Sequence, residues 1–341
     1  MSDHFPADHP KIKQPKIGVL LLNLGTPDAT DFWSVRRYLK EFLSDPRVIE
    51  ASKWVWLPIL NLIVLNTRPQ KSGAAYASIW DNERNESPLL TITRDQSEAL
   101  AKRLSGHEEI VVDFAMRYGN PSIKSVMDKL QAQGCQKILV VPLYPQYSAT
   151  TTATANDKVF EALEKMRWQP AVRTAPAYFD DPKYVETLGN SIRDGIAKLD
   201  FEPDLVITSY HGMPLEYLKK GDPYHCQCHK TTRLVGEYLG WEKGKLMVSF
   251  QSRFGPTEWL RPYTDQTLES LPAKGVKKVA ILAPAFSADC IETLEEIAIE
   301  GKEIFMHAGG ENFAYIPCLN ASDEGMEMIE SMVRRELGGW L

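Results

Sequence analysis

The chain has 341 residues, of which 43% are hydrophobic and 25% are charged, and its net charge is −6. This length is enough for two domains of ordinary size, and the negative charge argues against a nucleic acid as the main partner. The first sixteen residues are polar and rich in proline, without the apolar core of a signal peptide. Five scattered cysteines do not resemble a disulfide framework, so we expect a reduced, cytoplasmic protein.

Short, continuous apolar runs alternate with longer amphipathic stretches along the chain. Continuous apolar strands are expected where both faces of a parallel sheet are covered, and strand and helix alternation predicts parallel sheets wound with helices. The predicted strands are residues 17–25, 110–119, 137–145, 204–212, 245–255 and 276–286. The predicted helices between them include residues 95–104, 122–134 and 183–199.

The segment Trp54–Leu65, between the first two predicted strands, is apolar on nearly all sides. It is too short to cross a bilayer, which needs about 20 apolar residues, and Pro58 interrupts it. One interpretation is a buried helix. The other is an apolar lip that dips into a membrane surface or guards an apolar cleft. We call this segment the lip.

The predicted strands repeat in matched order. A strand followed by Gly-x-Pro occurs twice and ends at Pro27 and at Pro214. A strand followed by Arg-aromatic-Gly also occurs twice and ends at Gly119 and at Gly255. In a third pair, a strand that contains proline is followed by an aromatic residue and Ser-Ala. Three correspondences in the same order predict two similar α/β domains.

We therefore predict an α/β fold of two Rossmann-like domains, each a parallel sheet flanked by helices, with a cleft between them. The first would span residues 16–160, with the lip in an insert around residues 50–90. The second would span residues 170–320, and a helix in residues 321–341 would pack back on the first domain. Ligands bind beyond the carboxyl ends of the strands in such sheets, so these ends should line the cleft.

Two side chains at such ends could do chemistry. His211 ends a predicted strand just before a glycine, where a neutral imidazole can bind a metal or accept a proton, although many histidines are purely structural. Glu292 lies in the first turn of the helix that follows the last predicted strand. An acid there is also favoured by the helix dipole alone.

Glu292, Glu296 and Glu300 are four residues apart, so an α-helix would place them on one face. One interpretation of this row of glutamates is a solvated helix face. The other is a functional one, in which the row is a track that delivers a hydrated divalent cation to Glu292 and His211. Carboxylate and imidazole ligands suit divalent iron, cobalt or zinc. Two ligands make a weak site, which fits a metal that leaves again and is therefore a substrate.

The segment His225–His229, "HCQCH", is the rival metal site. Its two cysteines are separated by one residue, whereas zinc ligands are usually two to four residues apart. An iron–sulfur cluster would need Cys135, Cys290 or Cys318 to converge on them, so we expect no cluster. The sequence has no Walker A loop, no G-x-G-x-x-G after a strand and no G-x-S-x-G, which argues against nucleotide and hydrolase chemistry.

Eight segments together resemble the bacterial type of the ferrochelatase family. In order between Ile17 and Asn320, they are LLNLGTP, YLKEFLSDPRVIE, MRYGNP, PLYPQYSATTT, SYHGMP, GDPYHCQC, FQSRFGPTEWLRPYTD and FSADCIETLEEI. The resemblance implies two similar Rossmann-like, chelatase-like domains with a porphyrin cleft. It also implies insertion of ferrous iron into protoporphyrin IX, which gives protohaem and two protons as the last step of haem biosynthesis. Iron is then a substrate, and no cofactor is required.

The resemblance also assigns residues. The histidine of the family's S-x-H-G/S-x-P element falls on His211 and the glutamate of D-x-I-E-T-L on Glu292, as the catalytic and metal-binding pair. The family's acidic row falls on Glu296 and Glu300. Its porphyrin-cleft walls fall on Leu24, Arg117, Tyr118, Trp259 and Phe286. The lip corresponds to the place where porphyrin enters, with peripheral contact to the inner face of the membrane as a further expectation.

Two positions depart from the family pattern. "ESP", from Glu86, replaces the Gly-Ser-Pro of many relatives, and Cys290 stands where others have histidine.

The alternative functions are a chelatase for another tetrapyrrole, inserting iron into coproporphyrin or cobalt into sirohydrochlorin, and a non-catalytic haem or metal carrier. Coproporphyrin and sirohydrochlorin carry more carboxylates and should need a less apolar cleft, so the apolar lip favours protoporphyrin as the substrate. A carrier should hold its ligand firmly, whereas His211 and Glu292 offer few strong ligands.

Overall fold

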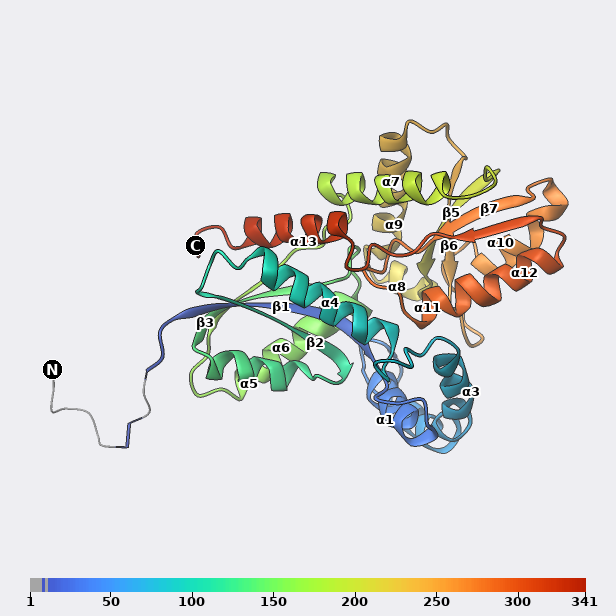
Figure 1. Cartoon of the computed structure of the whole chain (residues 1–341). Helices are drawn as coiled ribbons and strands as arrows, with labels where there is room; N and C mark the ends of the chain where they lie inside the picture. The colour runs from blue at the N-terminus through green and yellow to red at the C-terminus, as the bar shows by residue number, and fades with distance from the viewer. Residues whose placement is uncertain (1–7, 10–11) are drawn as a thin grey trace.

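The computed structural model describes residues 8, 9 and 12–341, which form two open sheets of parallel strands flanked by helices (Figure 1). Within these residues, the first sheet has the strand order β2-β1-β3-β4 and the second has the order β6-β5-β7-β8. The predicted fold class is confirmed. The prediction about a signal peptide falls largely on residues outside the described part of the chain.

The first sheet is built around β1, which is buried on both faces. From Ile17 to Asn23 every residue of β1 is buried. Val19 and Leu21 point into one apolar cluster, whereas Leu20 and Leu22 point into another, as the alternation of a strand requires. The strands are β1 (Lys16–Thr26), β2 (Ile110–Gly119), β3 (Cys135–Pro142) and β4 (Ala171–Thr174). The flanking elements are α4 (Pro88–Arg103), α5 (Ile123–Ala132), the π-helical turn η2 (Ala149–Ala153) and α6 (Thr154–Glu164).

The second sheet repeats this plan around β5. Val206 of β5 joins the cluster that Val19 and Leu21 also line, while Ile207 joins a cluster on the opposite face. The strands are β5 (Leu205–His211), β6 (Leu246–Gln251), β7 (Lys278–Leu282) and β8 (Asn312–Tyr315). The helices are α7 (Pro182–Ala197), α8 (Leu215–Lys219), α9 (Tyr224–Leu239), α10 (Thr264–Ser270), η3 (Pro272–Lys274), α11 (Ile291–Leu294), the π-helix η4 (Glu296–Gly301) and α12 (Lys302–His307).

The outer strands β4 and β8 were not among the predicted strands. Each has only four residues and pairs on one side, β4 with β3 and β8 with β7. Because β4 belongs to the first sheet, that sheet continues to Thr174. The domain limits 16–160 and 170–320 stay a prediction.

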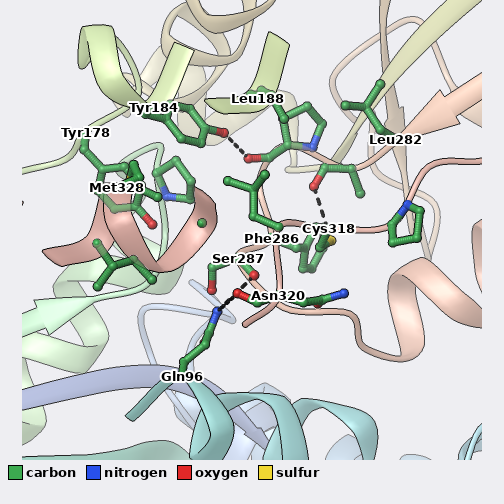
Figure 2. Close-up of a pocket in the computed structure, with 17 residues that line it drawn as sticks. Gln96, Tyr178, Tyr184, Leu188, Leu282, Phe286, Ser287, Cys318, Asn320 and Met328 are labelled. Carbon is green, nitrogen blue, oxygen red and sulfur yellow. Dashed lines mark hydrogen bonds between the residues drawn. The ribbon is translucent and has the colours of Figure 1, made fainter. Parts of the chain in front are cut away.

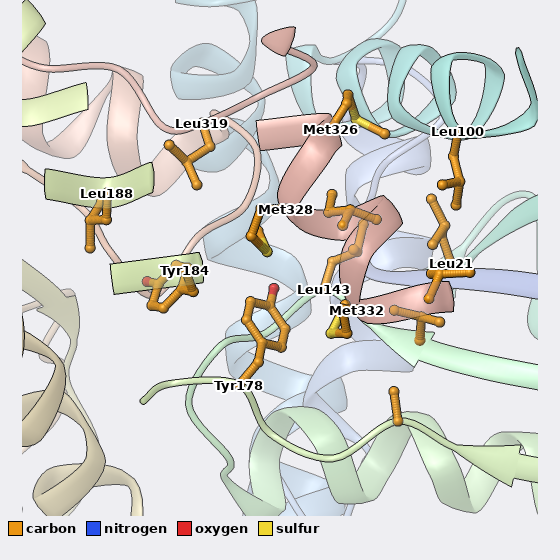
Figure 3. Packing of buried hydrophobic residues seen from close by; sticks show 14 of the residues in the cluster. Leu21, Leu100, Leu143, Tyr178, Tyr184, Leu188, Leu319, Met326, Met328 and Met332 are labelled. Atoms are coloured by element: carbon orange, nitrogen blue, oxygen red, sulfur yellow. The ribbon is translucent and has the colours of Figure 1, made fainter. Parts of the chain in front are cut away.

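The C-terminal helix α13 (Asp323–Glu336) contacts both halves of the molecule. Arg103 of α4 pairs with Glu330 at 3.3 Å, and Arg335 pairs at 2.6 Å with Asp181, the residue that caps α7. Figure 3 shows methionines of α13 among apolar side chains of the first half, such as Leu21 and Leu100, and of α7, such as Leu188. The helix therefore lies between the two halves as well as against the first one.

The lip lies in an insert between β1 and α4 (Figure 1). Trp54 is 91% exposed and Leu62 is 73% exposed, so the buried-helix interpretation is wrong for most of the segment. Leu60 and Leu65 are fully buried and hold the segment to the molecule. The insert comprises α1 (Phe32–Leu43), α2 (Lys53–Ile59), the π-helix η1 (Leu60–Val64) and α3 (Leu65–Ser78). In the described residues, every helix is too short or too polar to cross a membrane.

Candidate active site

His211 is the last residue of β5, at the carboxyl edge of the second sheet. Its Nδ1 lies 2.6 Å from the carbonyl oxygen of Gly212. A carbonyl can only accept a hydrogen bond, so Nδ1 carries a proton. In the neutral ring Nε2 is then left with a free lone pair. This arrangement suits a proton acceptor or a metal ligand.

Gly212 allows close packing directly after this histidine. Its backbone N–H donates to the carbonyl oxygen of Gln251 at 2.8 Å. A Cβ atom on Gly212 would lie 2.6 Å from that same oxygen and 3.2 Å from the ring of Trp259. Trp259, which was predicted to contact porphyrin, is therefore packed against the turn that carries His211. Glycine is required here by space.

Gln251 of β6 connects His211 to Glu292. It is aligned with His211 across the two strands. The hydroxyl of Ser209 donates to its Oε1 at 2.6 Å, and its Nε2 donates to the backbone oxygen of Glu292 at 2.6 Å. The structure thus brings the two predicted catalytic residues to one junction. Sequence reasoning missed Gln251, although a polar residue at the carboxyl end of an apolar strand is a usable signal.

Glu292 lies in the first turn of α11 and faces the first half of the molecule. It lines a narrow pocket together with Gly25, Thr26 and Tyr76. Burial, followed by the negative charge of Glu292, raises the pKa of Tyr76 above its ordinary value. A neutral phenol from α3 therefore lies near the carboxylate. The pocket is built by both halves of the chain.

The predicted row of three acids on one α-helical face is interrupted. The helix α11 ends at Leu294, and the amide of Glu300 bonds the carbonyl of Glu295 at 2.9 Å, which is π-helical pairing. A π-turn is wider than an α-turn, so a spacing of four no longer keeps acids strictly in line. Glu296 and Glu300 line a cavity of about 210 Å³, whereas Glu292 lines the narrow pocket beside it. Single π-helical turns of this kind occur often at functional sites.

Glu296 has an unusual environment inside this cavity. It accepts a hydrogen bond from the hydroxyl of Ser252. Burial, followed by the charge of Glu292, raises the pKa of Glu296 to about 8. Ser252 has a φ of 64°, a left-handed conformation that costs energy for a residue other than glycine and is often retained at functional sites. Glu296 is therefore suited to hold a proton near neutral pH and to release it when a cation arrives.

The mouth of the cavity carries one ion pair. Nη2 of Arg253 lies 3.2 Å from Oδ2 of Asp265, and both residues line the cavity. The guanidinium also lies over the ring of Tyr263, 4.5 Å from its centroid. The carboxylates of Asp265, Glu296 and Glu300 outnumber this single arginine among the lining residues. The lining therefore favours cations.

Leu24 of β1 and Phe286, which follows β7, are two of the predicted porphyrin contacts and come from different halves of the molecule. Both pack against the same small apolar cluster, formed by Leu89, Ala288 and Cys290. This cluster adjoins the turn that leads to Glu292. Apolar surface from both halves is thus available next to the candidate catalytic residues.

Arg117 and Tyr118, the other predicted porphyrin contacts, are turned into the protein. Arg117 forms a buried ion pair with Asp45, and the hydroxyl of Tyr118 donates to the same carboxylate at 2.8 Å. Burial raises the pKa of Asp45, but hydrogen bonds from Thr154 and from the backbone of Arg47, with the Arg117 charge, outweigh it and lower this pKa overall. Direct porphyrin contact by Arg117 and Tyr118 stays a prediction. In the structure they fix the chain around Asp45.

A polar network holds the turn before Glu292 on the first half of the molecule. Asp289 and Asn320 exchange two hydrogen bonds, from the Asp289 amide to Oδ1 at 2.8 Å and from Nδ2 to the Asp289 carboxylate at 2.7 Å. Figure 2 shows the fully buried Gln96 pointing from α4 towards this turn. Its Nε2 donates to the backbone oxygens of Asn320 at 2.9 Å and Ser287 at 3.1 Å.

The cysteines fall in separate places, except for Cys290 and Cys318. Burial raises the pKa of Cys290, and Cys318 lies close enough for its charge to add to the rise. Cys226 is exposed, whereas Cys228, two residues later and on the opposite side of α9, is fully buried. Cys135 lies at the start of β3, far along the chain from Cys290 before α11 and from Cys318 after β8. Among the residues that the structure describes, no group of three or more His, Cys, Asp or Glu side chains is arranged to hold a metal ion.

The fold resembles that of known chelatases. The structure of SirB from Bacillus subtilis with Fe3+ matches 95% of this chain and 97% of its own, with a TM-score of 0.55 at 12% identity. The Deinococcus radiodurans protein DR2241, described as structurally similar to chelatases, matches 93% of this chain and 54% of its own, with a TM-score of 0.52 at 12% identity. At this identity the likeness concerns the fold alone. The molecule has the two-domain architecture of the chelatase class.

Sequence comparison identifies the family within this class. The model of the Ferrochelatase family matches residues 16–337. The ferrochelatase of Allorhizobium ampelinum is 63% identical over 339 residues, 99% of this chain and 98% of its own. That of Agrobacterium fabrum is 60% identical over 337 residues, with the same coverage of 99% and 98%. The chain belongs to the ferrochelatase family. It is an enzyme that inserts ferrous iron into porphyrin for haem synthesis.

Proposed function

We propose that the porphyrin is protoporphyrin IX and that His211 accepts the pyrrole protons. The observation that carries this proposal is the junction at Gln251, which holds the turn after His211 and the backbone of Glu292 together. The free base carries two N–H groups inside its ring, and iron can replace these protons only if they are taken away. Nε2 of His211 is free to take them one at a time, because Nδ1 is engaged by the Gly212 carbonyl.

The acidic residues form the second part of the proposal. Ferrous iron would reach the ring through the cavity lined by Glu296 and Glu300, and Glu292 would bind the iron last or relay protons away. Support comes from the carboxylate-rich lining and from the raised pKa of Glu296. A glutamic acid that is protonated when the cavity is empty can exchange its proton for a cation. Two protons leave the porphyrin for each iron that enters, so the net charge of the porphyrin complex stays unchanged.

An apolar macrocycle fits the walls described above. Leu24 and Phe286 pack against one apolar cluster that contains Cys290, and Trp259 packs against Gly212, the residue after His211. The ring of Phe254 lies 5.4 Å from that of Trp259, and the guanidinium of Arg68 from α3 lies 5.1 Å above Phe254. The insert that carries the lip therefore reaches the loop after β6. These contacts favour protoporphyrin over the more carboxylated coproporphyrin and sirohydrochlorin, which need more cationic partners.

The test is anaerobic incubation with ferrous iron and protoporphyrin, following the loss of free-base fluorescence. Coproporphyrin with iron and sirohydrochlorin with cobalt run in parallel. We expect multiple turnovers on protoporphyrin, a loss of at least 100-fold in His211→Ala, and full activity in the matched control His107→Ala. His107 lies on the surface near Arg334 and Glu109. Faster turnover of another tetrapyrrole would overturn the substrate, and full activity of His211→Ala would overturn the mechanism.

We also propose that the lip touches a membrane surface, where an apolar porphyrin partitions. Trp54 and Leu62 are strongly exposed, and Lys53 directly precedes the segment. Isolated large apolar side chains on a surface are common, but a group of them on one short segment indicates contact with an apolar partner. We expect the protein to sediment with vesicles of anionic lipid and the variant Trp54→Ser/Leu62→Ser to stay in the supernatant. Trp168→Ser, which changes an exposed tryptophan far along the chain, is the matched control. Equal sedimentation of all three proteins would contradict the contact.

A further inference from the structure

Two histidines on α9 lie side by side outside the candidate active site. His225 and His229 are four residues apart on one helix, so they share a face. Their ring centroids are 4.5 Å apart. Two imidazoles in this arrangement can bind one metal ion through a nitrogen each, as the histidines of H-E-x-x-H helices bind zinc.

The ring nitrogens of this pair are not used for anything else. In the described part of the chain, neither imidazole makes a hydrogen bond or an ion pair. By contrast, His211 is engaged by the Gly212 carbonyl, and His107 lies against Arg334 and Glu109. Burial lowers the pKa of both His225 and His229, which favours the neutral form that binds metals. Each ring therefore keeps a lone pair available at neutral pH.

The pair has a fixed backing. The ring of His225 stacks on Phe250 at 5.7 Å with an interplanar angle of 16°, and His229 lies 6.2 Å from the same ring. Phe250 is almost completely buried and also lines the cavity that contains Glu296. Both rings are partly covered, and His225 is less exposed than His229. The two rings are thus held on one side by β6 and accessible on the other.

We propose that His225 and His229 bind one divalent transition-metal ion, such as copper or zinc, at a site separate from the iron route. Imidazole nitrogen suits these borderline ions, and affinity at such sites follows an order that places copper and zinc above ferrous iron. Water would complete the coordination. The two proposed ligands are imidazoles and not carboxylates like those of the cavity. The site would therefore select metal ions by their affinity for imidazole nitrogen rather than by charge. This ion is not the substrate, and the proposal does not depend on the mechanism given above.

The test is a titration of the metal-free, full-length protein. Cu2+ is added and followed by electron paramagnetic resonance, which detects coupling to imidazole nitrogens, and Zn2+ binding is measured by calorimetry. The variants are His225→Gln and His229→Gln. His107→Gln is the control for a surface histidine, and Glu296→Gln is the control for metal bound in the acidic cavity. Circular dichroism is measured for every variant, and iron insertion for the three histidine variants, to show that the fold is retained.

We expect the wild type and both controls to bind one equivalent of Cu2+ with a two-nitrogen signature. His225→Gln and His229→Gln should each lose that signature and bind at least tenfold more weakly, with iron insertion unchanged. Retention of the signature in both His225→Gln and His229→Gln would overturn the site. Loss of the signature in Glu296→Gln alone would place the bound ion in the cavity and would overturn it equally. Neither result would affect the role proposed for His211.

Discussion

Glu296 is a carboxylic acid whose surroundings oppose its charge. The group titrates at about 4.3 in an unfolded chain and at about 8 in the folded protein. Between these values the folded state binds more protons than the unfolded state, so stability is full below about pH 4.3 and falls as the pH rises towards 8. The slope can reach about 1.4 kcal/mol per pH unit.

We therefore expect Glu296→Gln to flatten this decline. An amide cannot ionise, so the variant should gain stability relative to the wild type as the pH increases, and the gain should level off above pH 8. Urea unfolding of metal-free protein at several pH values between 5 and 8.5 measures the difference. The same pH slope in both proteins would mean that Glu296 is ionised without cost. Glu300→Gln is the control, because that acid lies on the exposed end of η4.

Gly212 permits a second prediction at this scale. An added methyl would meet the Gln251 carbonyl at 2.6 Å and the Trp259 ring at 3.2 Å. We expect Gly212→Ala to cost about 1–3 kcal/mol of stability, as overpacking does. We also expect it to displace His211, so that kcat falls more than stability alone explains. Gly106→Ala is the control, because a methyl there meets open space. Unchanged kcat in a folded Gly212→Ala would show that the position of His211 does not depend on this contact.

Which single residues can be found from sequence depends on how local their signal is. His211 and Glu292 follow strands or begin helices, and that local pattern was enough to select them. Arg117 lies near the carboxyl end of a strand in the same way, but its partner Asp45 lies 72 residues earlier and turns it inward. The left-handed backbone conformation of Ser252 has no marker in the sequence, because serine rarely adopts it unless tertiary contacts impose it.

At the scale of elements, the long apolar strands were predictable and the irregular ones were not. The strands β1, β3, β5 and β7 are continuous apolar runs because both sheet faces are covered. The edge strands β4 and β8 have only four residues each and a mixed sequence. The π-helix η4 was also missed, because a hydrophobic pattern over six residues cannot distinguish a π-turn from an α-turn.

The network around Gln96 gives a prediction about one connection between elements. Replacing Gln96 with Met keeps the size of the side chain but leaves the carbonyl of Asn320 without this donor, whereas the carbonyl of Ser287 keeps its bond from the Asn320 amide. We expect a cost of about 1–3 kcal/mol. We further expect a lower kcat with a smaller change in KM for porphyrin, because the turn that carries Glu292 loses its anchor on α4.

Steady-state kinetics and urea unfolding measure these two effects. Gln131→Met is the matched control, since that glutamine also donates to a backbone carbonyl, that of Trp168, but lies on the exposed face of α5. If Gln96→Met lowers stability and leaves kcat unchanged, the network only holds the halves together. A lower kcat that follows the unfolded fraction would lead to the same conclusion.

At the scale of the whole molecule, the two sheets share part of one core. A single apolar cluster contains Leu21 of β1, Leu188 of α7, Val206 of β5 and Met332 of α13. Figure 3 shows Met332 and Met328 between side chains of the first half, such as Leu100, and side chains of the second, such as Leu188. The strand and helix order predicted two domains, but the shared core arises because the chain returns at its end. Such long-range packing leaves no periodic pattern in the sequence.

A shared core predicts that the molecule unfolds as one cooperative unit. Met332 is 2% exposed, and its replacement by Ala should cost about 2–5 kcal/mol through lost contacts and the cavity left behind. Met127 is fully buried in a cluster confined to the first sheet, so Met127→Ala is its counterpart. Because α13 packs against both halves, it should couple their unfolding. Both variants should therefore shift the same single unfolding transition in urea, whether that transition is followed by tryptophan fluorescence or by circular dichroism. An early phase that appears only in Met127→Ala would show that the first half unfolds alone and that α13 does not couple the two.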